Sequence, residues 1–301
     1  MNNAPHQTHT VRGYLAAVGA TAIWSGNFII ARGLSGSIPP VSLAFWRWSV
    51  AVLVFLPFAI KAFLRDLPII RKHPVYFSVT ALLGVTLFNT LVYTAGQTST
   101  AVNLSMISIT SPVFIIILAR LFMGEAITVN KRSGIILVVF GVLLLLTRGN
   151  LSRLTDLTFA IGDLWMLLAA LTFAVYSILL KHKPEGIGLW SFQFGTFLAG
   201  LLFLTPFYLW ERAVVPSFSF TTPMILSILY VGMFASLCAF LLWNQAVISI
   251  GPAKAGMIYY SVPIFSAFLA VLILGEQLRW YHPISLLIIV TGILIANKDP
   301  R

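Results

Sequence analysis

Stretches of about 20 predominantly apolar residues recur along almost the whole chain, and they constrain the fold more than any other feature. A helix of that length spans the ~30 Å hydrocarbon layer of a bilayer and satisfies its own backbone hydrogen bonds there. Charged residues make up only 9% of the 301 residues, and the mean hydropathy is +0.95. In soluble globular domains, about 25% of the residues are typically charged. The composition therefore excludes a water-soluble enzyme and predicts a polytopic membrane protein.

Short breaks with turn residues, such as Lys183-Pro184-Glu185-Gly186, separate the apolar blocks. The first block follows a polar segment without a small-residue cleavage site, so we interpret it as a retained helix. We expect ten transmembrane helices, at 13–33, 41–62, 74–95, 101–122, 133–147, 158–180, 189–210, 222–243, 253–274 and 280–297.

The sequence also contains an internal repeat. A shift of 151 residues places Ala101–Glu125 on Pro252–Glu276 with nine identities in 25 positions, where shared apolar composition should give roughly two or three. Each half would hold five helices, an odd number, so the second copy must enter the membrane inverted. Inverted repeats are typical of secondary transporters, whose substrate site lies near the midplane between the halves. The predicted fold class is an all-α, polytopic 5+5 helical basket.

The repeat divides the chain into units. We expect a cytoplasmic N-terminal tail at 1–12, a first five-helix repeat at 13–147, an extracytoplasmic linker at 148–157, a second five-helix repeat at 158–297 and a C-terminal tail at 298–301. Thirteen of the 19 Lys and Arg residues then lie on the side of the termini. Basic residues concentrate on the cytoplasmic side, so both termini are predicted to be cytoplasmic. The same bias accounts for the net charge of +11 without nucleic-acid binding.

Several motifs resemble a known group of transporters. They are the paired Pro112 and Pro263, each 13 residues before a Gly-Glu glutamate, the element Trp24-Ser25-Gly26-Asn27, and Phe45-Trp46-Arg47-Trp48. Together with the 5+5 repeat they resemble the drug/metabolite transporter superfamily, EamA type, over essentially the whole chain. Within it the chain is most similar to bacterial exporters of aromatic and other neutral amino acids. The resemblance implies a multi-pass protein of the bacterial inner membrane with a central cavity and alternating access without ATP.

Polar and aromatic side chains within the spans are candidates for the cavity lining, because lipid would leave their hydrogen bonds unmet. A lining of uncharged polar groups and rings suits a small zwitterion, since rings stack on aromatic substrates for ~0.5–1.5 kcal/mol each and attract an ammonium group. The alternative role of such residues is interhelical packing or interface anchoring. The predicted substrate-binding residues are Trp24, Asn27, Asn89, Tyr93, Ser108, Trp165, Tyr176, Trp243, Tyr259 and Tyr260.

Two prolines and two glutamates are the predicted gating residues. Pro112 and Pro263 lie near the middle of the fourth and ninth spans, where each removes a backbone hydrogen bond and favours a kink. A matched pair of kinks is either a gate hinge or a static bend. Glu125 and Glu276 end the same spans, and we expect them to be helix-end or gate partners of nearby Arg or Lys residues.

Arg47 is the most deeply placed charge, only six residues into the second span. We expect it to snorkel to the outer face with Trp46 and Trp48 as anchors, and the alternative is that it orients a substrate carboxylate. Lys254 begins the ninth span, where a topological role competes with binding of a substrate anion. The absence of a mid-span Asp or Glu favours facilitated over proton-coupled transport.

The predicted function is export of small neutral metabolites, mainly amino acids including aromatic ones, by alternating access. The alternative is a transporter of phosphorylated or nucleotide-linked metabolites, which needs two or more cations at the cavity, or of cationic drugs, which needs a carboxylate there. The sequence contains no HExxH, GxSxG or Walker A motif that would indicate an enzyme. The lone Cys238 can form neither an internal disulfide nor a cysteine metal cluster. We expect no cofactor and no metal, a small-molecule substrate and the lipid bilayer as partners, and a chain able to act as a monomer.

Overall fold

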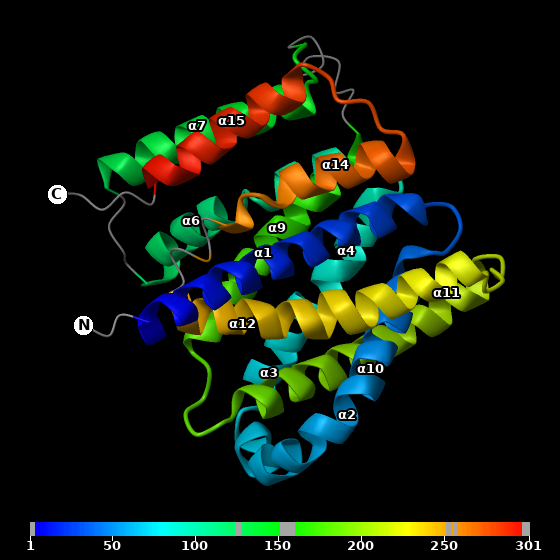
Figure 1. Cartoon of the computed structure of the whole chain (residues 1–301). Helices are drawn as coiled ribbons and strands as arrows, with labels where there is room; N and C mark the ends of the chain where they lie inside the picture. Colours follow the sequence, from blue (N-terminus) through cyan, green and yellow to red (C-terminus); the bar gives the residue numbers. More distant parts are fainter. Residues whose placement is uncertain (1–3, 124–127, 151–159, 251–254, 256–257, 297–301) are drawn as a thin grey trace.

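The computed structural model describes residues 4–123, 128–150, 160–250, 255 and 258–296. Every regular element within these residues is helical (Figure 1). The elements are α1 (Ala4–Gly33), α2 (Pro40–Lys72), α3 (Pro74–Ala81), the π-helix η1 (Leu82–Leu87), α4 (Phe88–Gly96), α5 (Ala101–Ser108), α6 (Ser111–Met123), α7 (Val129–Leu146), α9 (Ile161–Lys181), α10 (Leu189–Val214), α11 (Thr222–Leu229), the π-helix η2 (Tyr230–Cys238), α12 (Ala239–Ile250), α14 (Val262–Leu274) and α15 (Tyr281–Ala296).

Among the described residues, eight helical segments are long and apolar enough to cross a membrane, and the two shorter apolar helices α14 and α15 follow them. This confirms the prediction of an all-helical, multi-pass membrane protein. The eight segments are Val11–Gly33, Pro40–Lys72, Pro74–Gly96, Ala101–Phe122, Val129–Leu146, Ile161–Leu180, Leu189–Val214 and Thr222–Trp243.

The largest boundary difference concerns α2, which continues to Lys72 beyond the predicted end at residue 62. Asp66 holds this extension against the start of α10, because its Oδ2 accepts a hydrogen bond from the Gly188 backbone N–H at 2.9 Å. Its other oxygen accepts from Arg65 Nε at 2.7 Å. The extension therefore has a tertiary partner far along the chain, which apolar length alone could not indicate.

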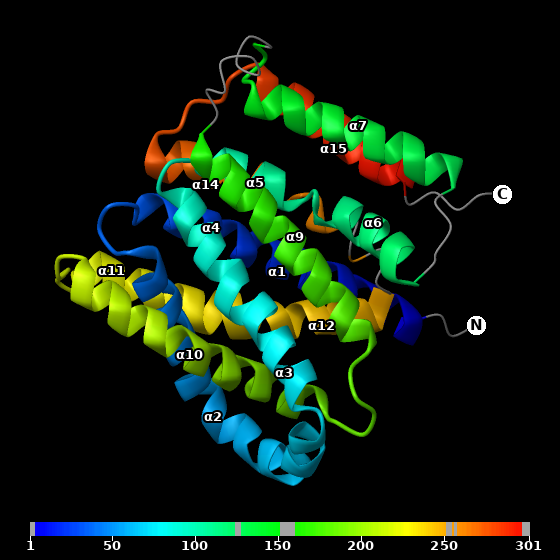
Figure 2. The ribbon, with the colours of Figure 1, turned by 180° about the vertical axis from the view of Figure 1, so that it is seen from behind.

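Helices of the first half of the chain pair with helices of the second half. Helix α7 lies beside α15, α2 beside α10, α1 beside α12 and α4 beside α9 (Figures 1 and 2). At the offset of 151 residues, α7 corresponds to α15 and α2 to α10. Exchanging the halves also converts the α1–α12 pair into the α9–α4 pair. Helix α1 begins and α15 ends at the same end of the molecule (Figure 1).

The α7–α15 pair is one place where the backbones of the two halves approach closely. A Cβ atom added at Gly134 would lie 2.4 Å from the carbonyl oxygen of Gly292, and one added at Gly292 would lie 2.7 Å from the carbonyl oxygen of Gly134. Small residues allow such contacts between membrane helices, where van der Waals packing replaces the hydrophobic driving force.

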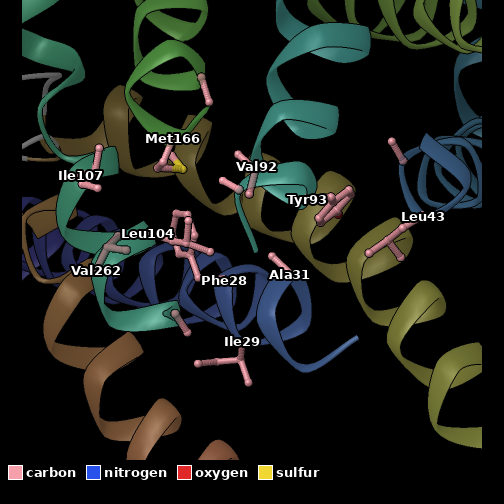
Figure 3. Packing of buried hydrophobic residues seen from close by; sticks show 14 of the residues in the cluster. Phe28, Ile29, Ala31, Leu43, Val92, Tyr93, Leu104, Ile107, Met166 and Val262 are labelled. Atoms are coloured by element: carbon pink, nitrogen blue, oxygen red, sulfur yellow. The ribbon is translucent and has the colours of Figure 1, made fainter. Parts of the chain in front are cut away.

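The core lies where the two halves meet. Figure 3 shows Phe28 of α1 beside Leu104 of α5, with Met166 of α9 and Val262 of α14 nearby. All four side chains are buried. Because α9 and α14 belong to the second half, neither half encloses this core by itself.

Two spans are interrupted near their middle. Helix α5 ends at Ser108 and α6 begins at Ser111, so that Pro112 occupies the first turn of α6. Turn residues Tyr260 and Ser261 likewise precede α14, whose first turn contains Pro263. A proline without an N–H fits the first turn of a helix, where that donor has no intrahelical partner. The expected kinks are therefore full breaks, and they occur at matching positions of the repeat.

Each half also contains one π-helix, η1 and η2. Shifted by 151 residues, Leu82–Leu87 falls on 233–238, inside η2. A π-helix shifts the hydrogen-bond register from i→i+4 to i→i+5, and such segments are frequent at functional sites. The repeat is thus visible in this local distortion as well as in the sequence.

Candidate functional site

A cavity of about 210 Å³ lies between helices of both halves. Its volume far exceeds the ~10–15 Å³ that a single water needs. The lining is mostly aromatic, and Arg47 is its one charged residue in the part of the chain that the structure describes. The lining residues are Trp24, Asn27, Phe28, Arg47, Trp48, Gly84, Val85, Phe88, Asn89, Phe173, Tyr176, Leu180, Gln193, Phe197, Ala235, Ser236, Phe240, Trp243 and Tyr259.

Arg47 does not snorkel, and this part of the prediction is wrong. Its side chain turns inward from α2, with only 5% of the residue exposed. Nη1 donates to Asn27 Oδ1 at 2.7 Å and to the Tyr93 hydroxyl at 2.9 Å, and Nε donates to Ser236 Oγ at 3.0 Å. Three polar partners, on α1, α4 and η2, therefore stabilise the buried guanidinium. Without them, the charged side chain would have to reach the membrane surface.

Trp48 beside Arg47 also differs from the expected membrane anchor. Trp48 is 4% exposed, and Cζ of Arg47 lies 5.1 Å from the centroid of its indole ring. The Trp48 indole N–H donates to the Val85 carbonyl in η1 at 3.1 Å. Trp46 instead packs edge-on against Tyr208 and Phe220 of the α10–α11 region. Only Trp46 therefore remains outside the cavity lining.

A second indole makes the equivalent contact with the other π-helix. Trp24 Nε1 donates to the Ala235 carbonyl in η2 at 3.0 Å. At the repeat offset, the two accepting carbonyls, Val85 and Ala235, differ by a single position. Backbone carbonyls of a distorted helix need partners inside a membrane protein, and an indole of the first half that lines the cavity supplies one to each π-helix.

Three rings form a cluster at one wall of the cavity, which we call the ring cluster: Trp24, Trp243 and Tyr259. Their centroids are 5.4 Å apart for the two indoles and 5.9 Å from each indole to the phenol. The interplanar angles of 53–73° expose both faces and edges. Such an arrangement can contact an aromatic side chain or a cation.

Two buried amides at the cavity lack a hydrogen-bond partner for their oxygen. Asn89 Oδ1 and Gln193 Oε1 belong to residues that are 3% and 5% exposed, and neither oxygen accepts a hydrogen bond within the described part of the chain. Both residues line the cavity. Buried acceptors are almost always paired in folded proteins, so these two oxygens remain available to a hydrogen-bond donor.

Six of the ten predicted substrate-binding residues line the cavity. They are Trp24, Asn27, Asn89, Tyr176, Trp243 and Tyr259. They come from α1, α4, α9, α12 and the segment before α14, so residues from both halves meet there.

The other four predicted residues lie outside the lining. Tyr93 is fully buried behind Asn27, to which its hydroxyl donates at 3.0 Å. Ser108 donates to the Ser105 carbonyl at the end of α5, and Tyr260 belongs to the turn before α14. Trp165 is 37% exposed. It shares a helix face with Tyr176 but lies three turns, ~16 Å, away along the helix axis. The sequence therefore predicted the helix face of Trp165 but not its distance from the cavity.

Sequence reasoning missed several lining residues, most importantly Gln193 and Ser236. A signal existed for Gln193, because an amide alone in an apolar span rarely faces lipid. Ser236 gave none, since a serine in a span is common as interhelical glue. Polar residues of the third predicted span have both roles, because Asn89 lines the cavity, whereas Thr86 donates to the Gly200 carbonyl of α10 at 3.0 Å.

Glu276 does not pair with a cation among the described residues. Its carboxylate accepts hydrogen bonds from the backbone N–H groups of Ala101 at 2.8 Å and Val102 at 3.2 Å, at the first turn of α5. A carboxylate is stabilised there by the exposed N–H groups and the positive end of the helix dipole. Within the described residues, Glu276 therefore contacts a helix N-terminus, and the predicted Arg or Lys partner stays a prediction. Glu125 and Lys254 lie outside the described residues.

A cavity between the two halves of a multi-pass helical protein is an architecture that secondary transporters of small solutes share. Comparison with known families agrees. The model of the EamA-like transporter family matches residues 11–147 and again residues 160–298. The chain therefore belongs to the EamA-like transporter family of the drug/metabolite transporter superfamily, and it is a membrane transporter and not an enzyme.

Individual relatives cover nearly the full chain. An uncharacterized transporter of Archaeoglobus fulgidus is 29% identical over 280 residues, 91% of this chain and 93% of that protein. The uncharacterized transporter YyaM of Bacillus subtilis is 25% identical over 285 residues, 94% of this chain and 93% of YyaM. A solved crystal structure shares the fold with a TM-score of 0.63 at 19% identity, over 97% of this chain and 96% of that one.

Proposed function

We propose that the protein exports small neutral metabolites, chiefly amino acids including aromatic ones, by alternating access around the cavity. The observation that supports this most directly is the composition of the lining, which combines many rings with a single buried cation among the described residues. Rings and one guanidinium match a molecule with an apolar side chain and one carboxylate. Transport of phosphorylated metabolites would call for two or more cations at the same place, and cationic drugs would call for a carboxylate.

The proposed architecture is ten membrane helices in two inverted repeats, at 13–147 and 158–297, with both termini cytoplasmic in a bacterial inner membrane. The pairing of α7 with α15 and of α2 with α10 supports it, because a two-fold axis in the membrane plane brings equivalent helices together. The matched π-helices and the matched breaks before Pro112 and Pro263 support it as well.

Discontinuous helices suit a transporter that changes its open side. We propose that the breaks before Pro112 and Pro263 are gate hinges, since unpaired backbone at mid-membrane allows each half-helix to tilt. Hydroxyl groups stabilise the turn at each break, where each donates to a carbonyl that also accepts a backbone N–H. Thr110 Oγ1 donates to the Ile107 carbonyl at 2.7 Å and Ser261 Oγ to the Ile258 carbonyl at 2.6 Å.

Counterflow into proteoliposomes tests the function. Vesicles containing the purified protein are loaded with an unlabelled compound from one of three groups, namely amino acids, sugar phosphates and quaternary amines, and uptake of the labelled compound is followed. We expect exchange for amino acids, aromatic ones included. Exchange restricted to phosphorylated compounds, or to quaternary amines, would exclude the amino-acid function.

A further inference from the structure

The charge of Arg47 is uncompensated within the described residues. Its hydrogen-bond acceptors are an amide, a phenol and a hydroxyl, all neutral. The one ion pair found there, Arg65 with Asp66, lies at the far end of α2. A buried charge is stable only when it is paired or fully hydrogen-bonded. No hydrogen bond among the described residues uses Nη2 of Arg47, so one edge of the guanidinium remains for an anionic ligand.

The unpaired acceptors complement this cation. Asn89 on α4 and Gln193 on α10 line the same cavity, and the amide oxygen of each is buried without a hydrogen-bond partner in the described residues. Asn89 is four residues before Tyr93, the Arg47 partner, so both lie on one face of α4. An ammonium group can donate three hydrogen bonds and accepts none. It can therefore donate to both unpaired amide oxygens at once.

We infer that the cavity binds a free α-amino acid as its zwitterion, with the carboxylate on Arg47 and the ammonium group on the amide oxygens of Asn89 and Gln193. The side chain then contacts the ring cluster. This inference rests on the proposed function and narrows it, because it requires both charged groups on one molecule. Amines without a carboxylate, acids without an amine and N-acylated amino acids lose one of the two contacts.

The first experiment uses the wild-type protein and needs no variant. Counterflow of labelled phenylalanine is measured against increasing 2-phenylethylamine, which lacks the carboxylate, 3-phenylpropanoate, which lacks the amine, and N-acetylphenylalanine. We expect each analogue to compete at least ~10-fold more weakly than phenylalanine, since each loses hydrogen bonds to a charged group.

The outcomes separate the two proposals. If phenylalanine exchanges but 2-phenylethylamine or 3-phenylpropanoate competes equally well, the zwitterion site is overturned and amino-acid export stands. If phenylalanine does not exchange at all, the zwitterion site as stated here is overturned, and exchange of other amino acids in the panel then decides the proposed function.

The second experiment assigns the residues. In Arg47→Gln we expect the apparent affinity for phenylalanine to fall ~10- to 100-fold while that for 2-phenylethylamine is unchanged. In the near-isosteric Asn89→Leu and Gln193→Met variants, the preference for phenylalanine over 3-phenylpropanoate should fall instead. A structural role for Arg47 would weaken both ligands equally, and that result would overturn its assignment.

Two further variants control for folding. Arg47→Lys keeps the charge and should retain part of the preference for phenylalanine over 2-phenylethylamine, even if Arg47→Gln does not fold. Ser285→Ala removes another buried polar atom without a partner, in α15 and outside the cavity lining. It should leave every preference unchanged. A loss of preference in Ser285→Ala would mean that the ratios report general destabilisation, and the residue assignment would fail.

Discussion

Neutral side chains from three helices fix the position of the one charge at the cavity. Tyr93 has the central place among them, because its hydroxyl accepts from Arg47 and donates to Asn27. The phenol thereby aligns the guanidinium and the amide that both line the cavity. Tyr93 acts as a positioning residue, because it does not line the cavity itself.

Tyr93→Phe tests this role with little change in volume. It removes two buried hydrogen bonds, one of them to a charged group, so we expect the free energy of unfolding to fall by about 1–3 kcal/mol. The Michaelis constant for amino-acid exchange should rise by up to ~10-fold as the guanidinium loses its alignment. Thermal unfolding in detergent and counterflow measure the two effects. Wild-type behaviour in both assays would contradict a positioning role.

Gly84 is a second sensitive position, because the Tyr176 ring packs directly on it. A Cβ atom at Gly84 would lie 2.4 Å from Tyr176 Cδ2. Gly84→Ala should therefore push the ring into the cavity and reduce exchange of aromatic amino acids more than that of alanine. Gly19→Ala is the matched control, since its nearest contact is 3.3 Å away on a flexible leucine. Equal exchange of large and small substrates in Gly84→Ala would refute this effect.

The cavity lining was predictable only where the residue type itself carries the signal. Trp24, Asn89 and Tyr259 are polar or aromatic groups within apolar spans, and such groups tend to face the interior. The burial of Arg47 was not predictable in this way, because an arginine near a helix end stays buried only when hydrogen-bond partners lie within its reach. Its partners Asn27 and Ser236 lie 20 and 189 residues away along the chain.

At the scale of elements, the paired breaks distinguish this protein from a simple bundle. Alanine would restore a backbone N–H at Pro112 or Pro263 and remove the steric obstacle to a continuous helix. If the breaks are hinges, Pro112→Ala and Pro263→Ala should slow exchange severalfold while leaving substrate binding intact. Binding in detergent and counterflow in vesicles separate the two. Wild-type exchange in both variants would leave the breaks as static bends.

The π-helices lead to a prediction with an internal control. Trp24→Phe and Trp48→Phe retain a ring but leave the Ala235 or Val85 carbonyl without its indole donor. Each should lower the free energy of unfolding by about 1–3 kcal/mol. Trp46→Phe should cost less, because the Trp46 indole nitrogen has no hydrogen-bond partner in the described residues. Equal losses in all three variants, measured by thermal unfolding, would show that ring size matters and the carbonyl contact does not.

Apolar length predicted the existence and approximate limits of the helices, since the hydrocarbon layer sets a minimum length. Their internal irregularities were predictable only in part. Pro112 and Pro263 mark the broken spans, but nothing in Leu82–Leu87 marks a π-helix. The extension of α2 to Lys72 also depends on Asp66 meeting Gly188, a contact between distant parts of the chain.

At the scale of the whole molecule, the proposed orientation can be tested with single cysteines. In a Cys238→Ala background, Ser217→Cys lies between α10 and α11, and His73→Cys lies between α2 and α3. Both positions are exposed. With cytoplasmic termini, a membrane-impermeant maleimide should label Ser217→Cys in intact cells and His73→Cys only after permeabilisation. The reverse pattern would invert the proposed topology.

The partnering of α2 with α10 has a consequence for how the protein is made. Translation proceeds at roughly 5–20 residues per second, so α2 enters the bilayer on the order of ten seconds before α10 is synthesised. During that interval its inward-facing Arg47 has Asn27 and Tyr93 nearby but lacks Ser236. The nascent first half should therefore need contacts with the insertion machinery or with lipid until the second half is synthesised. A chain whose translation stalls after α7 should be sensitive to membrane proteases.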